Sequence, residues 1–294
     1  IPNPPLVEQR RIAERVSERI PRVEEYGKLE DKRGALDAEL PDRLRNSILQ
    51  LAVQGKLVPQ DPNDEPASAL LERIRTERAQ LIKEKKIKVP KSGESVIYRA
   101  SDGGYYEKRG KGEAQPIEVP FDIPSNWEWA RVSTVFNLVR GSGIKRTEVT
   151  DEGIPCVRYG ELYTTYEAEI VKPTSKTSED VFDKAQKLLP DEAVATLTGE
   201  NDTDIGRTVV NSTNQTIAFG GDLLGLKGGY IDGHFAALSM NSPYMGIQRT
   251  ALASGNIIVH LSADKIGSFL IAVPPIEEQR RIVSRVTSLL AAIG

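Results

Sequence analysis

The chain has 294 residues, of which 39% are hydrophobic and 28% charged, enough to bury the core of one large domain or two modest ones. Its net charge of −3 does not by itself indicate nucleic acid binding, and its one cysteine, Cys156, excludes an internal disulfide or a cysteine-based zinc cluster. No apolar run approaches the roughly 20 residues that cross a membrane, and the first residues lack the apolar core of a signal peptide. We therefore expect a cytoplasmic protein with no membrane partner. Because residue 1 is isoleucine, we also expect a fragment, a processed chain or incomplete numbering.

Residues 4–86 are predicted to form long helices. Apolar side chains recur there at spacings of three, four or seven residues, which places them on one helix face: Ile12, Val16, Ile20, Val23, Leu29, Leu36, Leu40, Leu44, Ile48 and Leu51. The seven-residue spacing predicts coiled-coil packing against another helix. Pro21 and Pro41 are expected to kink or restart the helix, because proline removes an amide donor. After a turn-rich loop, Ser68 is expected to cap a second helix.

The sequence changes character after residue 88. Residues 89–118 are predicted to be a linker with a small β-hairpin, in which two short β-type runs flank a Ser-Asp-Gly-Gly turn. Residues 119–270 contain short β-type runs separated by Gly and Asn or Asp turns, with one helix expected near residues 178–188. We predict a mixed α/β globular domain of ordinary size. Asn256, which follows a glycine, is expected to be a turn residue.

The two ends of the chain carry the same motif. Ten residues of the segment 1–16 recur at an offset of 270 in the segment 271–286: Ile1, Pro4, Pro5, Glu8, Gln9, Arg10, Arg11, Ile12, Arg15 and Val16. A repeat this dense predicts a chain built from one periodic unit, cut so that the same junction appears twice. Residues 271–294 are therefore predicted to start a second helical region like that of residues 1–88.

The stretch Asn3-Pro4-Pro5-Leu6 looks like the catalytic motif of methyltransferases that modify the amino group of adenine. In the repeat, however, Val273 stands where Asn3 stood, and valine cannot hold the target amino group. Leu6 and Ile276 also replace the aromatic residue on which a flipped base would stack. We therefore predict a loop that leads into a helix, with proline near its first turn and Glu8 near its positive end.

Several motifs, in this order, resemble the specificity subunit of type I restriction–modification systems. They are the "PPLVEQRRI" start, the run from Leu44 to Arg78, the "IYRASDGGYYEK" hairpin, "PFDIPSNWEWARV", "ALASGNIIVHLS" and the second "PPIEEQRRI". The resemblance covers nearly the whole chain. It implies a DNA-recognition and scaffold subunit that is not an enzyme and has no cofactor of its own. The implied partners are DNA, the methylation (M) subunits, which bind S-adenosylmethionine, and the restriction (R) motor-nuclease subunits, which bind ATP.

The family's usual plan also implies a fold. Two target recognition domains alternate with two helical regions, which pair as an antiparallel coiled coil that sets the gap between two DNA half-sites. Here we expect an α+β chain with one recognition domain at residues 119–270, so the chain resembles a half subunit or the second half of a longer one. A self-dimer through the helical regions, or a missing first half, would supply the second domain.

The recognition domain is expected to read DNA through residues whose side chains suit base edges and phosphates. Ten candidates lie in its predicted loops: Arg140, Lys145, Arg146, Arg158, Tyr159, Tyr163, Asn201, Arg207, Gln248 and Arg249. Arg158 follows an apolar run and is expected at a strand end. The alternative for each is an ordinary surface arginine or a half-buried tyrosine. Since acidic residues share these loops, we do not expect strong non-specific DNA binding by this chain alone.

Two other functions remain open from the sequence. A coiled-coil adaptor without catalysis or a DNA role would explain the apolar stripe. A DNA methyltransferase or nuclease fragment would need a methyl-donor loop or an Asp…Glu-x-Lys pair, and neither motif is convincing here. No metal site is predicted, because the stretch "ENDTD" lacks the glycine and glutamate of a calcium-binding loop.

Overall fold

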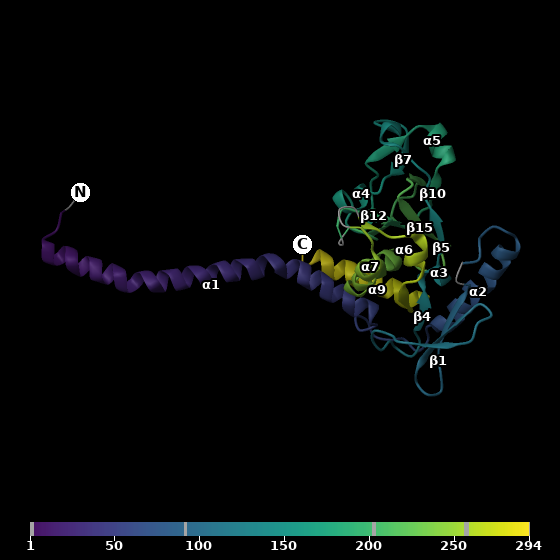
Figure 1. Cartoon of the computed structure of the whole chain (residues 1–294), viewed down its shortest axis with the longest axis horizontal. Coiled ribbons are helices and arrows are strands. Elements are labelled where there is room, and N and C mark those ends of the chain that lie inside the picture. Colours follow the sequence, from purple (N-terminus) through teal and green to yellow (C-terminus); the bar gives the residue numbers. More distant parts are fainter. Residues whose placement is uncertain (1–2, 91–92, 202–203, 256–258, 294) are drawn as a thin grey trace.

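A computed structural model describes residues 3–90, 93–201, 204–255 and 259–293, so Asn256 lies outside the described residues. One long helix projects from a body in which helices and strands mix (Figure 1). The predicted α+β class is confirmed. The α-helices are α1 (Leu6–Val53), α2 (Ala67–Lys83), α3 (Val132–Val135), α4 (Glu161–Thr164), α5 (Glu179–Lys184), α6 (Gly233–Met240), α7 (Pro243–Leu252), α8 (Ala263–Gly267) and α9 (Ile276–Ala291).

Two five-stranded sheets form most of the body, in the orders β10-β14-β7-β9-β6 and β5-β15-β11-β13-β8. Smaller sheets are β1-β2-β3, β12-β16 and β17-β4. The strands are β1 (Ser95–Arg99), β2 (Tyr105–Arg109), β3 (Gln115–Ile117), β4 (Glu128–Arg131), β5 (Asn137–Arg140), β6 (Val149–Thr150), β7 (Ile154–Val157), β8 (Glu169–Ile170), β9 (Ser175–Thr177), β10 (Gln186–Leu188), β11 (Ala193–Thr196), β12 (Thr198–Gly199), β13 (Thr208–Asn211), β14 (Ile217–Phe219), β15 (Leu223–Lys227), β16 (Val259–His260) and β17 (Leu270–Val273). The chain passes from one large sheet to the other six times: between β5 and β6, β7 and β8, β8 and β9, β10 and β11, β13 and β14, and β14 and β15.

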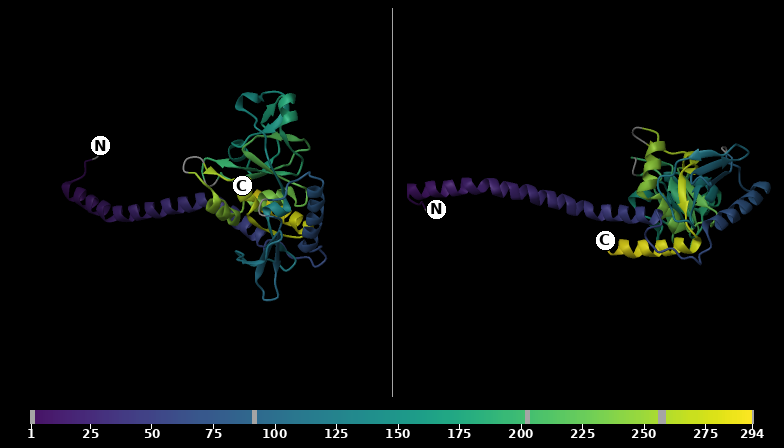
Figure 2. Two further views of the ribbon diagram at one scale, coloured as in Figure 1. Left: turned by 45° about the vertical axis from the view of Figure 1, so that its right-hand side comes forward. Right: turned by 90° about the horizontal axis from the view of Figure 1, so that it is seen from below.

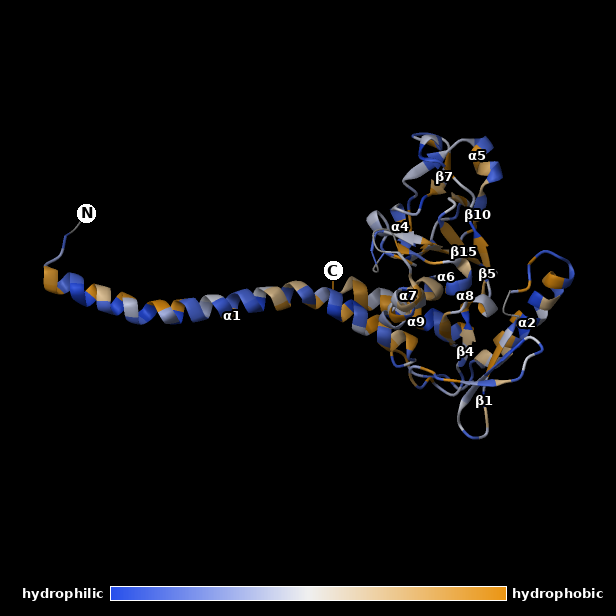
Figure 3. Cartoon of the chain, viewed as in Figure 1, coloured by the Kyte–Doolittle hydropathy of each residue, from blue (hydrophilic) through white to orange (hydrophobic). Residues whose placement is uncertain are grey.

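Helix α1 is 48 residues long, which corresponds to about 72 Å at 1.5 Å per residue. Most of it projects away from the body in every view (Figures 1 and 2). The apolar side chains of the predicted stripe are exposed from Ile12 to Leu44. Figure 3 shows these orange residues recurring among blue polar ones along the helix. Within the described residues, this stripe is therefore uncovered.

Of the two outcomes expected at Pro21 and Pro41, a kink or a restart, the restart does not occur, because α1 runs through both prolines. Each proline leaves the carbonyl of the residue four positions earlier, Ser17 or Asp37, without its helical donor. Both of these residues are exposed, so water can hydrogen-bond to the freed carbonyl. The start of α1 at Leu6, with Pro5 at the cap, confirms the predicted loop-to-helix start.

Two other helix predictions need correction. Pro66, not Ser68, precedes the first residue of α2, and the amide of Ala67 donates to the carbonyl of Asn126 at 2.9 Å. The backbone carbonyl of Asn126, in a distant loop, therefore accepts a hydrogen bond at the start of α2, where the side chain of Ser68 was expected to accept one. The helix expected near residues 178–188 is only the six residues of α5, and the chain then enters strand β10.

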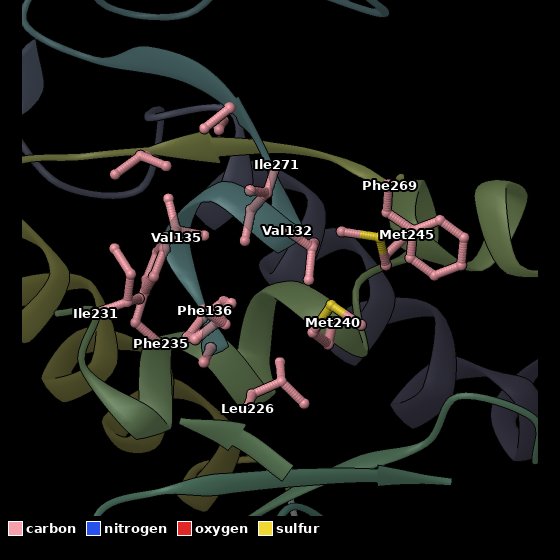
Figure 4. Packing of buried hydrophobic residues seen from close by; sticks show 14 of the residues in the cluster. Val132, Val135, Phe136, Leu226, Ile231, Phe235, Met240, Met245, Phe269 and Ile271 are labelled. Atoms are coloured by element: carbon pink, nitrogen blue, oxygen red, sulfur yellow. The ribbon is translucent and has the colours of Figure 1, made fainter. Parts of the chain in front are cut away.

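One core joins the end of α1 to the globular body. Leu49, Ala52 and Val53 of α1 belong to the same buried cluster as Ile74 of α2 and Trp129 of β4. Figure 4 shows part of this cluster, where side chains from α3, α6, α7, β15 and β17 converge. Because these segments share apolar contacts, the end of α1 is fixed to the body rather than hinged on it.

Helix α9 runs back along the end of α1 in the opposite direction (Figures 1 and 2). Its residues Ile282 and Val286 are buried. The predicted antiparallel helix packing is thus present over this short contact. None of the helices in the described ranges is both long and apolar enough to cross a membrane.

The predicted hairpin is confirmed: β1 and β2 pair antiparallel, and β3 adds a third strand. Its buried acid, Glu107, joins the hairpin to strand β4. Arg131 donates to both carboxylate oxygens, at 3.0 and 2.7 Å, and the hydroxyl of Ser95 donates at 2.7 Å. Burial alone would raise the pKa of Glu107, but the hydrogen bonds from Arg131, Ser95 and Arg109 outweigh it and lower the pKa to about 2.

This carboxylate predicts a loss of stability in acid. A pKa lower in the folded than in the unfolded chain stabilises the fold above the unfolded pKa, and this contribution disappears as the pH falls toward about 2. We expect Glu107 to account for about 2 kcal/mol of the free energy of unfolding lost between pH 7 and pH 3. Denaturant unfolding of the chain and of Glu107→Gln over this range measures it. Equal losses in the two proteins would contradict the assignment.

Candidate nucleic-acid interface

Most of the predicted DNA-binding residues lie where the chain passes between the two large sheets. The turn of residues 220–222, which joins β14 to β15, is at the centre of this junction. The amide of Gly220 donates to the carbonyl of Val157 at 3.1 Å, at the end of β7. The amide of Gly141, just after β5, donates to the carbonyl of Leu223 at 2.8 Å. The ends of β5 and β7 therefore meet at one turn.

Glycine at position 141 is required by this close approach. A Cβ atom at Gly141 would lie 1.9 Å from the carbonyl oxygen of Gly220, so any side chain would push the loop away from the turn. The loop of residues 141–148 consequently leaves β5 directly beside the turn.

Lys145 and Arg146 are exposed on this loop, although its backbone is held in place. Ile144 is buried beside Cys156, and the amide of Lys145 donates to Oε2 of Glu148 at 2.7 Å. Two cationic side chains thus project from a fixed backbone. Such an arrangement suits phosphate or base contacts, since little of the loop has to be ordered on binding.

Two further arginines flank the turn. Arg140, at the end of β5, has a side chain 67% exposed; its Nε donates to the carbonyl of Gly221 at 2.9 Å. Arg158 directly follows β7, at a strand end as expected, and is partly exposed. Both guanidinium groups are therefore carried by strand ends of the same junction, next to Lys145 and Arg146 in the fold.

Helix α4 and the residues beside it add the aromatic side chains of Tyr159 and Tyr163, and Asn201 adds an amide. The rings of Tyr159 and Tyr163 lie 6.3 Å apart and tilted by 49°. Burial, and then the nearby carboxylate of Glu200, raise the pKa of Tyr163 to about 12, so this hydroxyl is a neutral donor at physiological pH. Asn201 is exposed, and its Oδ1 accepts the amide of Asp204 at 3.0 Å.

Two acidic residues of these loops form hydrogen bonds within the protein. Glu148 accepts the amide of Lys145, as described above. Glu161 accepts the hydroxyl of Ser175 at 2.6 Å, and burial raises the pKa of its carboxyl. Both carboxylates therefore have hydrogen-bond partners within the protein.

Gln248 and Arg249 were expected on an exposed loop, and the structure corrects this. Both lie in helix α7, which Ser242 caps by accepting the amide of Met245. The side-chain amide of Gln248 donates to the carbonyl of Leu270 at 2.9 Å and accepts its amide at 2.8 Å. Gln248 binds the backbone of Leu270 and Arg249 is buried, so neither residue belongs to the candidate DNA-binding surface.

Arg249 is 8% exposed and packs on Gly206, where a Cβ atom would lie 2.7 Å from its Cδ. Burial, and then the charge of Arg207, lower the pKa of Arg249 to about 10. Arg207 is also committed to the protein, because its Nη2 donates to the carbonyl of Glu167 at 2.6 Å. It lies near α1, where Arg45 pairs with Glu167 at 3.2 Å. Arg207 is therefore set apart from the junction that carries Lys145 and Arg146.

The sequence did not indicate the importance of the turn at residues 220–222, which reads only as a glycine-rich loop. It also did not indicate what the repeated motif contacts. Glu278 and Gln279 in the second copy are fully buried. The sequence signal for Glu278 and Gln279 was their identity with Glu8 and Gln9, because a repeated motif keeps residues that make contacts as well as residues that form a helix.

The chain is 43% identical over 121 residues to the type I restriction enzyme EcoAI specificity subunit of Escherichia coli. That match covers 41% of this chain and 18% of the subunit. It is 40% identical over 119 residues to the EcoEI specificity subunit of the same organism, covering 40% of this chain and 16% of that subunit. No family model matches the chain.

A solved structure is also similar. The HsdS subunit from Thermoanaerobacter tengcongensis gives a TM-score of 0.46 at 19% identity, covering 100% of this chain and 54% of that one. The chain thus spans about half of this solved subunit, and its sequence matches cover less than a fifth of the curated relatives.

The fold is a mixed α/β body with one projecting helix, and a cluster of exposed cations lies at the junction of its two large sheets. About two fifths of the chain is similar in sequence, at 40–43% identity, to type I restriction enzyme specificity subunits.

Proposed function

We propose that this chain is the non-catalytic DNA-recognition part of a type I restriction–modification complex. Residues 119–270 form a target recognition domain that reads one half of a bipartite DNA sequence. The helical regions, residues 1–88 and 271–294, hold the spacing and dock the methylation and restriction subunits. The observation that carries the proposal is the 43% identity to a subunit named for the specificity of a type I restriction enzyme.

The geometry supports a role in spacing. Helix α1 is about 72 Å long, which is about two turns of DNA at roughly 34 Å each. Its far end therefore lies at a distance from the recognition domain suited to a second half-site. The exposed stripe on α1 gives a partner helix an apolar surface to pack against.

The DNA surface of this proposal consists of the residues at the sheet junction. Arg140, Lys145, Arg146 and Arg158 supply positive charge, and Tyr159, Tyr163 and Asn201 supply neutral polar groups. This mixture fits recognition by phosphate contacts that position the domain and base contacts that select the sequence.

Co-expression with the methylating subunit of the same system, followed by sequencing for modified adenine, tests the proposal. We expect a bipartite modified motif only when both proteins are present. A palindromic motif would mean that two copies of this chain pair, and an asymmetric one would mean a second, different recognition domain. Modification by this chain alone would overturn the non-catalytic assignment. Assembly of the two proteins without sequence-specific modification would favour the coiled-coil adaptor.

A further inference from the structure

Strand β5 is an open edge of its sheet. It pairs with β15 on one side, and in the described part of the chain no strand lies on its other side. An edge strand exposes a row of main-chain N–H and C=O groups, which can pair with another extended chain. Figure 1 shows β5 on the side of the body that faces away from the projecting part of α1. This edge is thus separate from the apolar stripe of that helix.

The pairing with β15 determines which main-chain groups of β5 point outward. The amide of Gly141 donates to the carbonyl of Leu223 at 2.8 Å, so this opposite pair is hydrogen-bonded. Opposite pairs in an antiparallel ladder alternate between bonded and non-bonded, and β5 keeps one register from Asn137 to Arg140. The N–H and C=O groups of Leu138 and Arg140 therefore point away from β15. They make no hydrogen bond in the described part of the chain.

Arg78 already pairs with the first outward group of this edge. The carbonyl of Phe136, two residues before Leu138, points outward by the same alternation and accepts a hydrogen bond from Nη1 of Arg78 at 3.2 Å. Nη2 of Arg78 is held by Oε1 of Glu94 at 3.1 Å. A guanidinium from α2 thus closes one end of the edge, and the next two outward-facing residues, Leu138 and Arg140, are left unpaired.

A groove of about 610 Å³ lies at this open edge. All of β5 lines it, together with residues 86–90 and helix α8. Ile87, Val89, Leu138 and Val139 give it apolar walls. At α8, a Cβ atom on Gly267 would lie 3.1 Å from Cδ1 of Leu138, so the helix packs directly on the strand. The groove therefore offers apolar surface next to unpaired main-chain groups.

The charged residues that line the groove are mostly cationic. They are Arg78, Lys86, Lys88, Arg109, Arg131 and Arg140, against one acid, Asp264. Arg109 and Arg131 share a single carboxylate, that of Glu107. Lys88 is exposed and has no ion-pair partner among the described residues. Acidic side chains of a partner are complementary to this lining, whereas a second copy of the chain would bring like charges together.

We propose that the edge of β5 binds an extended protein segment with acidic and apolar side chains, which joins the five-stranded sheet as a further strand. Its main chain pairs with the outward groups of Leu138 and Arg140, its apolar side chains fill the groove, and its acidic side chains meet the cations. DNA fits less well, because a phosphate backbone offers nothing to the apolar walls or to the outward carbonyls. The proposal does not depend on whether the domain reads DNA.

A short fluorescent peptide of alternating glutamate and valine, titrated into the full chain, tests the proposal. We expect saturable binding, and binding at least about tenfold weaker when lysine replaces glutamate in the peptide. Amide exchange measured by NMR locates the contact. In the free chain, the amides of Leu138 and Arg140 should exchange fast and that of Val139 slowly, because only Val139 donates to β15. Peptide at about ten times its dissociation constant should slow exchange at Leu138 and Arg140 about tenfold.

Two pairs of variants separate the main-chain contact from the charge. Leu138→Pro removes the outward N–H, and an edge strand tolerates proline where the missing N–H faces away from the sheet. Leu138→Ala is its control, because it shortens the side chain and keeps the N–H. Proline should weaken peptide binding at least about fivefold more than alanine. Lys88→Glu, which leaves the strand untouched, should also weaken binding at least about fivefold, whereas Lys172→Glu, just after β8 at the opposite edge of the sheet, should not.

Several results would contradict the proposal. Equal binding of the glutamate and lysine peptides would remove the acidic partner, and equal effects of Leu138→Pro and Leu138→Ala would remove the main-chain pairing. Slow exchange at Leu138 and Arg140 that appears without peptide and grows with chain concentration would identify a second copy as the occupant. Slow exchange at the same amides on addition of target DNA alone would assign this edge to the DNA surface instead.

Discussion

Replacing Lys145, Arg146 and Arg158 together by alanine is expected to lower the affinity of the assembled complex for its target by about 100- to 1,000-fold, since each contact to a base or phosphate contributes about 1–1.5 kcal/mol. All three side chains are at least partly exposed, and none holds the fold together through a hydrogen bond of its side chain that the structure shows. Assembly with the methylating subunit should therefore be unchanged. Binding titrations of the wild-type and variant complexes on target DNA, at one fixed salt concentration, measure the loss.

The matched control removes the same three positive charges from the hairpin. Arg99, Lys108 and Lys111 are exposed there, and Figure 1 places β1 at the opposite end of the body from β7 and α4. Alanine at these three positions should change affinity by less than about threefold. Equal losses in the two variants would show that net charge, and not the sheet junction, determines binding. A junction variant with full affinity would move the DNA surface elsewhere.

Inserting four residues after Arg33 is expected to lengthen the unspecified gap of the DNA target by one to two base pairs, because four helical residues add about 6 Å and one base pair about 3.4 Å. This part of α1 is exposed on all sides, so the insertion disturbs no contact with the body. Four residues are also an insertion that coiled coils absorb by local unwinding. The bases of the two half-sites should stay the same, because the recognition loops are untouched.

Sequencing of modified adenine in cells that carry the methylating subunit determines the new motif. Gly34→Ala is the control that keeps the helix length: a Cβ atom there meets nothing within 4 Å, and alanine favours the helix by about 1 kcal/mol over glycine. Its motif should be that of the wild type. If the insertion variant directed modification of a motif with different half-site bases, the proposed assignment of base recognition to residues 119–270 and of spacing to the helical regions would be wrong.

Local patterns predicted the parts of this fold that depend on neighbouring residues. The stripe from Ile12 to Leu51 predicted a long helix, and the two β-type runs predicted the hairpin of β1 and β2. The helix α7 also had a local signal, since Ser242 and Pro243 are a cap and a first-turn proline. The loop prediction for this stretch did not use that signal, which is why Gln248 and Arg249 were misplaced.

The sequence predicted individual residues of the candidate site, but not which of them lie next to one another. Arg158 was placed correctly because a strand end follows from its apolar run. Its neighbourhood with Arg140 and Lys145 depends on the parallel pairing of β7 with β14, which are about sixty residues apart in sequence, and no short-range pattern encodes that pairing. Likewise, the repeat contains Glu278, but no local pattern indicates that its partner is Trp127, 151 residues away.

The shared core between α1 and the body also has an evolutionary consequence. Leu49, Val53 and Ile74 pack with Trp129 and Ile282 in one cluster, so genetic recombination at the linker before residue 119 would join two halves of a core that had not evolved together. A crossover in the exposed middle of α1, such as near Gly34, would leave every such contact within one parent. If the body reads DNA as proposed, new specificities should arise by exchange of the body together with the last turns of α1, with breakpoints in the exposed part of that helix.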